Sequence, residues 1–268
     1  MKKNQKKNNG IKIYKLYFLL CLFTLNACKE TVKQEVEIVS EKITIYTVGD
    51  STMANKPNPE ENPERGWAQM LPNFLTEDAV VENHAVNGRS TRSFIDEKKW
   101  ETVYNKLQKG DYVFIQFGHN DQKENSPKRY TNPTTAYRNN LIKFVEETRE
   151  KEANPVLFTS IVRRSFNADS TLVDTHGIYP LVVRLVAQEY NVPLIDLQYL
   201  TELMEESYGV KGSEKLHLHY KPNEIPYYPE GKKDDTHLSV LGATEVAKLV
   251  TKELKMKVKP LTKFLKKD

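Results

Sequence analysis

The stretch Ile43-Thr-Ile-Tyr-Thr-Val-Gly-Asp-Ser-Thr52 decides the fold. Its β-branched and aromatic residues predict a buried strand, and the Gly-Asp-Ser turn that follows places Ser51 where this strand ends. In open parallel sheets ligands bind at the carboxyl ends of the strands, so a serine at this point is positioned for chemistry. The alternative is a plain turn in which Ser51 caps the next helix.

Strands and helices are expected to alternate along the rest of the chain. Four further β-rich runs are found at residues 80–86, 112–117, 156–162 and 193–197. Apolar residues recur at helical spacing near residues 66–75, 135–151, 178–190 and 239–254. This alternation predicts βαβ units, and therefore a three-layer α/β/α sandwich with a five-stranded parallel sheet. Segments 163–177 and 209–236 fit neither pattern and are expected to be irregular walls of a substrate cleft.

The amino end has the pattern of an export signal. Six lysines precede the apolar run 16–25, which is about half of the roughly 20 residues that a spanning helix needs. Leu25-Asn-Ala-Cys28 resembles a bacterial lipobox, and Cys28 would be the only cysteine left after cleavage, without a partner for an internal disulfide. We expect a lipoprotein signal over 1–27, a tether over 28–41 and one domain over 42–268, with the lipid anchored in the outer membrane. Secretion without lipid is the alternative.

The charge of the chain excludes one class of partner. Cleavage after residue 27 would change the net charge from +4 to −2, because six lysines and no acids leave. A slightly acidic protein lacks the basic face that nucleic-acid binding normally needs. We therefore expect no nucleic-acid partner, no membrane contact other than the lipid, and a monomer.

Polar loops also follow the second and third predicted strands. Asn87-Gly-Arg-Ser90 follows the second and Gly118-His-Asn-Asp121 the third. Since parallel strands end at one edge, the N–H groups of Ser51 and Gly88 and the amide of Asn120 are candidate donors for the oxyanion of ester hydrolysis. The alternatives are a turn that needs positive φ at Gly88 and an Asx-turn at Asn120.

The stretch Asp234-Asp-Thr-His237 lies just before the last predicted helix. Residues three apart share a face when the backbone is helical or tightly turned. Asp234 can then hold one ring nitrogen of His237, which leaves the other to take a serine proton. Asp235 would point elsewhere, and the alternative for the whole stretch is a polar helix start.

These four blocks, in this order, resemble those of the SGNH (GDSL-like) hydrolases. The resemblance implies a flavodoxin-like SGNH hydrolase fold and no metal or organic cofactor. It also implies a serine esterase in which Ser51 is the nucleophile, His237 the base and Asp234 its orienting partner. The oxyanion hole would consist of Ser51, Gly88 and Asn120.

A narrower resemblance, over residues 43–255, is to the rhamnogalacturonan acetylesterases. It is carried by Gly49-Asp-Ser-Thr-Met-Ala54, Arg65-Gly-Trp67, Asn87-Gly-Arg-Ser-Thr-Arg-Ser-Phe-Ile95 and Phe117-Gly-His-Asn-Asp121. It implies removal of acetyl groups from the pectin backbone, so the expected partner is an acetylated polysaccharide or oligosaccharide. Deacetylation of another glycan such as xylan, a lipase- or thioesterase-like activity, and glycan binding without catalysis stay open.

Arginine forks match uronate carboxylates, and aromatic faces stack on sugar rings. The candidate substrate contacts are Arg65, Trp67, Arg89, Arg92, Arg163 and Arg164. Surface ion pairing is the alternative for the arginines, and core packing is the alternative for Trp67. His217-Leu-His219 lacks the carboxylate or cysteine cluster of a metal site and is expected to be a pair of loop histidines.

Overall fold

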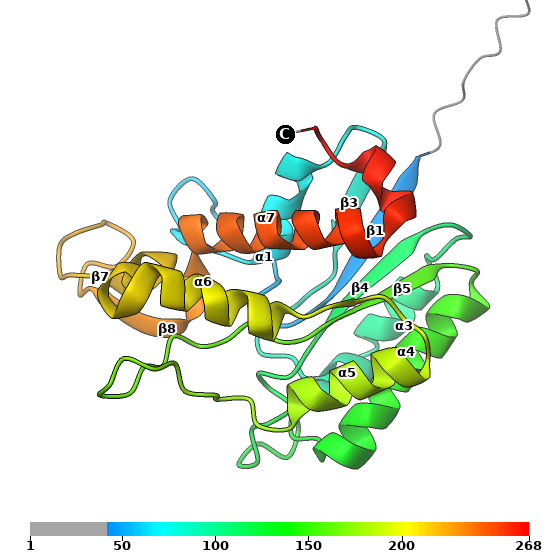
Figure 1. Cartoon of the computed structure of the whole chain (residues 1–268), viewed down its shortest axis with the longest axis horizontal. Helices are drawn as coiled ribbons and strands as arrows, with labels where there is room; N and C mark the ends of the chain where they lie inside the picture. The colour runs from blue at the N-terminus through cyan, green and yellow to red at the C-terminus, as the bar shows by residue number, and fades with distance from the viewer. Residues whose placement is uncertain (1–41, 268) are drawn as a thin grey trace, which may run out of the picture. The chain divides into compact units, whose positions relative to one another are not determined.

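The computed structural model describes residues 42–267, and its main element is a five-stranded parallel sheet. In spatial order the strands are β3 (Ala79–Asn83), β1 (Ile43–Gly49), β4 (Tyr112–Gln116), β5 (Asn154–Phe158) and β6 (Leu194–Ile195). The central strand β4 and its neighbour β1 are almost entirely buried, because helices cover both faces of the sheet (Figure 1). The predicted fold class is confirmed, whereas the expected signal, tether and Cys28 lie outside the described residues.

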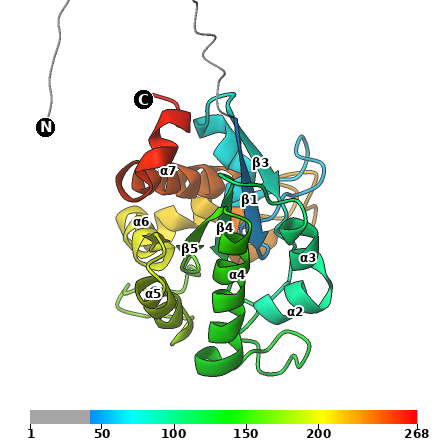
Figure 2. The ribbon, with the colours of Figure 1, turned by 90° about the vertical axis from the view of Figure 1, so that its right-hand side faces the viewer.

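Two hydrophobic cores, one on each face, make the three layers. Ile45, Phe114 and Phe158 face the core that contains α1 (Trp67–Met70) and α7 (Val240–Lys257). Val48 and Ile115 face the other core. Its helices are α2 (Thr91–Asp96), α3 (Lys99–Tyr104), α4 (Arg138–Glu150) and α5 (Tyr179–Glu189). Figure 2 shows α7 on one side of the strands and α2 and α3 on the other.

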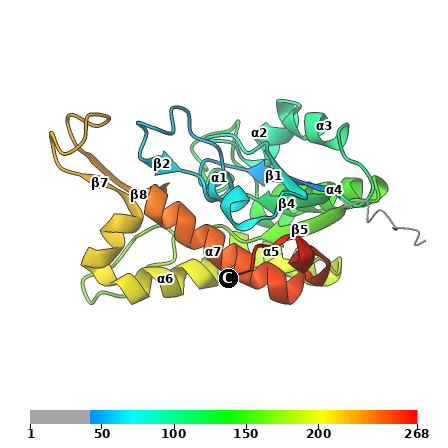
Figure 3. The same ribbon diagram turned by 90° about the horizontal axis from the view of Figure 1, so that it is seen from above.

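A second, antiparallel sheet was not predicted. It consists of β2 (Glu64–Arg65), β8 (Lys232–Ser239) and β7 (His217–Tyr220), in that order. Figure 3 shows β7 and β8 projecting beyond the large sheet at the end where α7 begins.

This sheet corrects part of the expectation that segment 209–236 is irregular. The segment contains the end of α6 (Leu197–Gly212), a 3-10 turn at Ser213–Leu216, all of β7 and the first five residues of β8, whereas residues 221–231 between the two strands are irregular as expected. Charged residues such as Lys232 and Lys233 disfavour a strand on propensity alone, but pairing with β7 places them there. Segment 163–177 is irregular as expected, with an isolated bridge between Phe166 and Leu172.

Between residues 42 and 267, no helix has both the length and the apolar composition needed to cross a membrane.

Candidate active site

Ser51 lies in the turn that ends β1. The backbone carbonyl of Asp50 accepts from the N–H groups of Met53 and Ala54 at 3.2 and 3.0 Å. The Asp50 carboxylate accepts from the Thr52 N–H at 3.0 Å and from its hydroxyl at 2.8 Å. These bonds fix the turn tightly, and Ser51 itself is 9% exposed. Its hydroxyl is therefore held in one place yet is reachable from outside.

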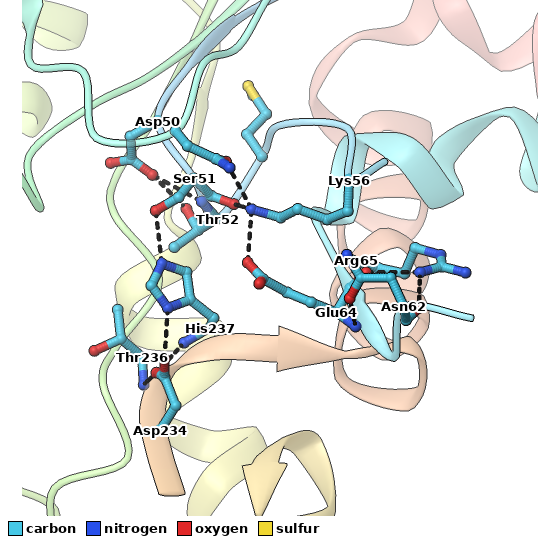
Figure 4. Close-up of polar contacts among 12 residues, drawn as sticks. Asp50, Ser51, Thr52, Lys56, Asn62, Glu64, Arg65, Asp234, Thr236 and His237 are labelled. Carbon is cyan, nitrogen blue, oxygen red and sulfur yellow. Dashed lines mark hydrogen bonds and ion pairs between the residues drawn. The ribbon is translucent and has the colours of Figure 1, made fainter. Parts of the chain in front are cut away.

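The structure brings Ser51, His237 and Asp234 into one hydrogen-bonded chain (Figure 4). Ser51 Oγ lies 2.9 Å from His237 Nε2, and His237 Nδ1 lies 2.9 Å from Asp234 Oδ2. Burial alone would raise the pKa of Asp234, but hydrogen bonds from the side chain and backbone of His237 lower that pKa below its usual value. The ionised carboxylate accepts the Nδ1–H, so Nε2 of a neutral His237 can accept the serine proton.

A bulge in β8 brings Asp234 and His237 together. The pairing of β7 with β8 passes from Leu218–Asp234 to His217–Leu238, so the three residues between Asp234 and Leu238 have no partner on β7. The sequence predicted a helical or tight turn at the start of a helix. The same spacing is produced instead by extra residues in a strand, a feature that recurs beside active sites.

Asp235, inside this bulge, has other partners. Its Oδ1 accepts from Arg164 Nη1 at 2.8 Å and lies 2.8 Å from His219 Nε2. Burial would raise the pKa of Asp235, but these two groups lower it. Arg164 also donates from Nε to Ser213 Oγ at 3.0 Å. Arg164 thus holds the bulge and does not line the cavity, which corrects the expectation of a substrate contact there.

Gly88 and Asn120 line the same cavity as Ser51. Gly88 has φ +75°, a backbone conformation that glycine adopts without strain, so the turn alternative and the oxyanion role are compatible. Among residues 42–267, the backbone N–H groups of Ser51 and Gly88 have no protein acceptor. Asn120 Nδ2 donates to the Arg89 carbonyl at 3.1 Å, and its second amide hydrogen is left for a substrate oxygen.

The cavity that contains Ser51 has a volume of about 410 Å³. It is lined by Ser51, Glu64, Asn87, Gly88, Asn120, Lys123, Arg129, Lys232, Asp234 and His237. None of these lining residues has an apolar side chain. Sequence reasoning missed Glu64, Asn87, Lys123, Arg129 and Lys232. Segment 163–177 contributes no lining residue, which corrects its expected role as a cleft wall.

Two expected substrate contacts are core residues instead. Trp67 is fully buried, donates from Nε1 to Gln116 Oε1 at 2.8 Å, and has its ring centroid 5.4 Å from that of Phe158. Arg65 is also buried. Its guanidinium donates to three backbone carbonyls of its own loop, those of Pro59, Asn62 and Glu64. The Arg-Gly-Trp stretch is therefore structural, and both predictions were wrong.

The other three arginines also lie outside the cavity lining. Arg89 Nε is 2.9 Å from Glu97 Oε2, the surface ion pair that was the alternative. Arg92 donates at 3.0 Å to a backbone carbonyl of the loop that follows β4. Arg163 donates to the carbonyl and hydroxyl of Thr175 at 3.3 and 3.2 Å. The structure gives all three protein partners and does not bring them to Ser51.

Lys56 is a buried cation that no sequence pattern singles out. Its side chain is 1% exposed, and Nζ lies 2.7 Å from Glu64 Oε1. Nζ also donates to the Ser51 carbonyl at 2.7 Å (Figure 4). A further bond runs from Nζ to Asn87 Oδ1 at 2.8 Å. All three ammonium hydrogens are used. Lys56 therefore connects the serine loop, the glycine loop and the small sheet.

His217 and Glu205 form a buried pair behind the base. His217 Nε2 lies 2.7 Å from Glu205 Oε1, and His217 Nδ1 lies 3.2 Å from the backbone carbonyl of His237. A carbonyl oxygen only accepts, so Nδ1 carries a hydrogen, and Nε2 faces the Glu205 carboxyl group. The histidines of β7 are therefore not a loop pair. His217 supports the backbone of His237, and His219 supports Asp235.

Asp121 holds the loop that carries Asn120. Its Oδ1 accepts from the Thr91 N–H at 3.0 Å and from the hydroxyls of Thr91 and Thr131 at 2.5 and 2.7 Å. Burial raises the pKa of Asp121 to about 7, against the lowering effect of these hydrogen bonds. One buried carboxyl group at the start of the loop thus binds both the end of the loop at Thr131 and the start of α2 at Thr91.

Over residues 42–267, no group of three or more His, Cys, Asp or Glu side chains is placed to hold a metal ion.

Comparison with known proteins gives consistent matches. The chain fits the model of the GDSL-like Lipase/Acylhydrolase family over residues 47–244. It is 40% identical to rhamnogalacturonan acetylesterase RhgT of Bacillus subtilis (strain 168), over 85% of this chain and 96% of that protein. It is 34% identical to the probable rhamnogalacturonan acetylesterase YesY of the same organism, over 84% and 98%. The solved structure of Bacillus subtilis protein YxiM superposes with a TM-score of 0.66 at 25% identity, covering 80% of this chain and 56% of that one.

Proposed function

The chain belongs to the GDSL-like Lipase/Acylhydrolase family, as a relative of the rhamnogalacturonan acetylesterases, and on this premise we propose that it removes O-acetyl groups from rhamnogalacturonan. Family membership makes it a serine carboxylic-ester hydrolase. The observation that carries the proposal is the chain of two 2.9 Å contacts from Ser51 through His237 to Asp234, at the floor of a polar cavity.

The first half of the proposed reaction acylates the serine. His237 Nε2 takes the Ser51 proton as Oγ attacks the acetyl carbonyl carbon, while Asp234 stabilises the imidazolium that forms. The N–H groups of Ser51 and Gly88 and the amide of Asn120 donate to the oxyanion. The carbon–oxygen bond to the sugar then breaks, and the sugar oxygen leaves with the proton from His237. The products of this half are the free sugar hydroxyl and acetyl-Ser51.

Water completes the cycle by the same route. His237 takes a proton from a water molecule as the water oxygen attacks the acetyl carbon. The tetrahedral intermediate is held by the same donors. It collapses to acetate, and the serine oxygen regains its proton from His237.

The lining of the cavity favours a glycan over a lipid. Acyl chains are bound in apolar tunnels, whereas every lining residue of this cavity is polar, charged or glycine. A lipase-like activity is therefore disfavoured. Xylan deacetylation is distinguished from pectin deacetylation by substrate charge, because a xylan backbone is neutral and a rhamnogalacturonan backbone carries uronate carboxylates.

Acetate release tests the proposal. The purified chain from Lys29 onward is incubated with acetylated rhamnogalacturonan, acetylated homogalacturonan and acetylated xylan, with Ser51→Ala as the control. Release chiefly from rhamnogalacturonan that disappears in Ser51→Ala is the expected result. Release of acetate from xylan alone would support the esterase mechanism and contradict the proposal that pectin is the substrate. Equal release by Ser51→Ala would remove Ser51 as the nucleophile.

We also propose export and lipidation at Cys28, from the lysine-rich apolar leader and the Leu25-Asn-Ala-Cys28 stretch. Labelled palmitate should be incorporated into the full chain expressed in a bacterium, and the protein should fractionate with outer membranes. Cys28→Ser should abolish both. Labelling that persists in Cys28→Ser would contradict the assignment.

A further inference from the structure

The two acidic groups in the cavity are already neutralised by protein partners. Glu64 Oε1 lies 2.7 Å from the buried ammonium of Lys56. Asp234 Oδ2 lies 2.9 Å from His237 Nδ1 and 3.7 Å from Lys232 Nζ. Neither carboxylate is left to pair with the other cations of the lining.

Two cations of the cavity wall lack an acidic partner. Lys123 and Arg129 belong to the loop between β4 and α4, and no carboxylate among residues 42–267 pairs with either of them. Arg129 Nε donates to the neutral hydroxyl of Ser126 at 2.9 Å. The lining therefore has an excess of positive charge at this wall.

These cations also lie close enough to repel each other. Partial burial lowers the pKa of Lys123 first, the charges of Arg129 and Arg163 lower it further, and the buried Asp50 carboxylate offsets this in part. Arg163, just behind the wall, donates to Thr175 and to the His119 carbonyl and forms no ion pair among the described residues, although the Asp50 charge acts on it as well. An anion bound at the wall would relieve this repulsion.

The backbone of the loop that carries the two cations is fixed by hydrogen bonds before any ligand binds. The carbonyl and carboxylate of Asp121, at the start of the loop, bind the Thr131 N–H at 3.0 Å and the Thr131 hydroxyl at 2.7 Å at its end. Lys123 N–H donates to the Asn120 carbonyl at 3.2 Å, which ties the cationic wall to the oxyanion donor. A group bound by Lys123 thus lies next to the reacting ester.

We propose that Lys123 and Arg129 form a carboxylate subsite that binds a uronate group of the substrate next to the acetyl ester. This inference rests on the proposed function and deepens it, because it names the residues that select an acidic glycan over a neutral one. An arginine fork matches a carboxylate, and a lysine ammonium supplies a point charge beside it.

The test compares two forms of one polymer. Acetylated rhamnogalacturonan carries uronate carboxylates, and its carboxyl-reduced form has neutral hydroxyl groups in their place. An aryl acetate serves as a third substrate, because its hydrolysis measures the esterase reaction without glycan binding. The wild type should have a kcat/KM about tenfold higher on the acidic polymer than on the reduced one, as charge-assisted hydrogen bonds predict. Lys123→Ala and Arg129→Ala should each lower this ratio severalfold, mainly through KM, and added salt should lower it in the wild type.

Matched variants separate the subsite from folding and from overall charge. Lys128→Ala removes the same charge from an exposed position of the same loop outside the cavity lining, so its ratio should equal that of the wild type. Lys123→Arg should retain the preference. An equal loss on both polymers and on aryl acetate in Lys123→Ala, or a wild-type ratio near one, would overturn the subsite.

A competition assay separates failure of the subsite from failure of the proposed function. Rhamnogalacturonan oligosaccharides without acetyl groups are added to the aryl acetate assay, in acidic and in carboxyl-reduced form. Inhibition by the acidic form alone, weakened in Lys123→Ala but not in Lys128→Ala, supports the subsite even if no polymer is deacetylated. Equal inhibition by both forms, or none by either, overturns it even if rhamnogalacturonan is a substrate.

Discussion

The two halves of the candidate active site are built on different sheets. Ser51 follows β1 of the large parallel sheet, and buried residues surround its turn. His237 and Asp234 lie on β8 of the small antiparallel sheet, where most side chains are partly exposed. The nucleophile is therefore positioned by a packed hydrophobic core. The base is positioned by polar contacts around a strand bulge.

This difference predicts how each half responds to change. The serine half depends on packing and on backbone bonds around Asp50, which substitutions at the surface do not reach. The base half depends on charged or titratable pairs, Glu205 with His217 and Arg164 with Asp235. The ion pair of Lys56 with Glu64 joins the two halves behind the cavity.

The sharpest test asks whether the two halves act as one unit. His237→Ala and Ser51→Ala should each lower kcat by about 10⁴- to 10⁶-fold, and the double variant should be no slower than either single one. The reason is that the serine is a poor nucleophile without its base. Initial rates on aryl acetate measure this, and circular dichroism checks the fold. A further large loss in the double variant would mean that the halves contribute independently.

The next test concerns the oxyanion donor on the serine side. Asn120→Ala should lower kcat by about 10²- to 10³-fold, the usual loss for one such donor. Asn125→Ala, an exposed asparagine of the same loop outside the cavity lining, is the control and should be unaffected. Full activity of Asn120→Ala would exclude its amide from the oxyanion hole.

A third prediction tests the polar support of the base. Glu205→Leu leaves the ring of His217 without its partner, and we expect kcat/KM to fall by about tenfold and the melting temperature to drop. Glu205→Gln can donate to Nε2 of a neutral His217, so it should restore most of the activity. Activity and melting are measured for both variants. Equal activity and equal melting temperature of Glu205→Leu and Glu205→Gln would show that this hydrogen bond does not position His237.

The smallest effect on catalysis is expected at Asp121, which should act on stability instead. With its pKa raised to about 7, folded Asp121 keeps a proton between about pH 4 and pH 7 that the unfolded chain has lost. Its contribution to the free energy of unfolding therefore falls as pH rises through this window and is constant above it. Asp121→Asn should remove this fall, measured by urea unfolding at several pH values. If the free energies of unfolding of variant and wild type differ by the same amount at every pH from 4 to 8, the prediction is contradicted.

The parallel sheet was predictable because its signals are local. The run from Ile43 to Val48 and the runs that become β4 and β5 are rich in β-branched and aromatic residues and bounded by turn residues, so the parallel strands and the polar loops at one edge follow. The fold class and the family are confirmed. The roles of Ser51, His237 and Asp234 stay predictions, although the structure places the three side chains in contact.

The small sheet and most of the cavity wall were not predictable from local signals. β8 begins with Lys232-Lys-Asp-Asp235, which has no strand pattern and pairs only because β7 lies beside it. Lys123, Arg129 and Lys56 are isolated charges in loops, and only the folded arrangement shows which of them line the cavity and which are buried. Conversely, Trp67 was predicted to stack on a sugar ring because it is aromatic, but its side chain is buried in the core.

The number of residues in the β8 bulge sets the distance between Asp234 and the base His237. The pairs Leu218–Asp234 and His217–Leu238 fix the strand on either side, so one residue deleted or inserted between them must be absorbed within the bulge itself. Such a change would turn the His237 ring away from Asp234 while the flanking pairs keep their register. For redesign, the segment from Asp234 to His237 is therefore fixed in length.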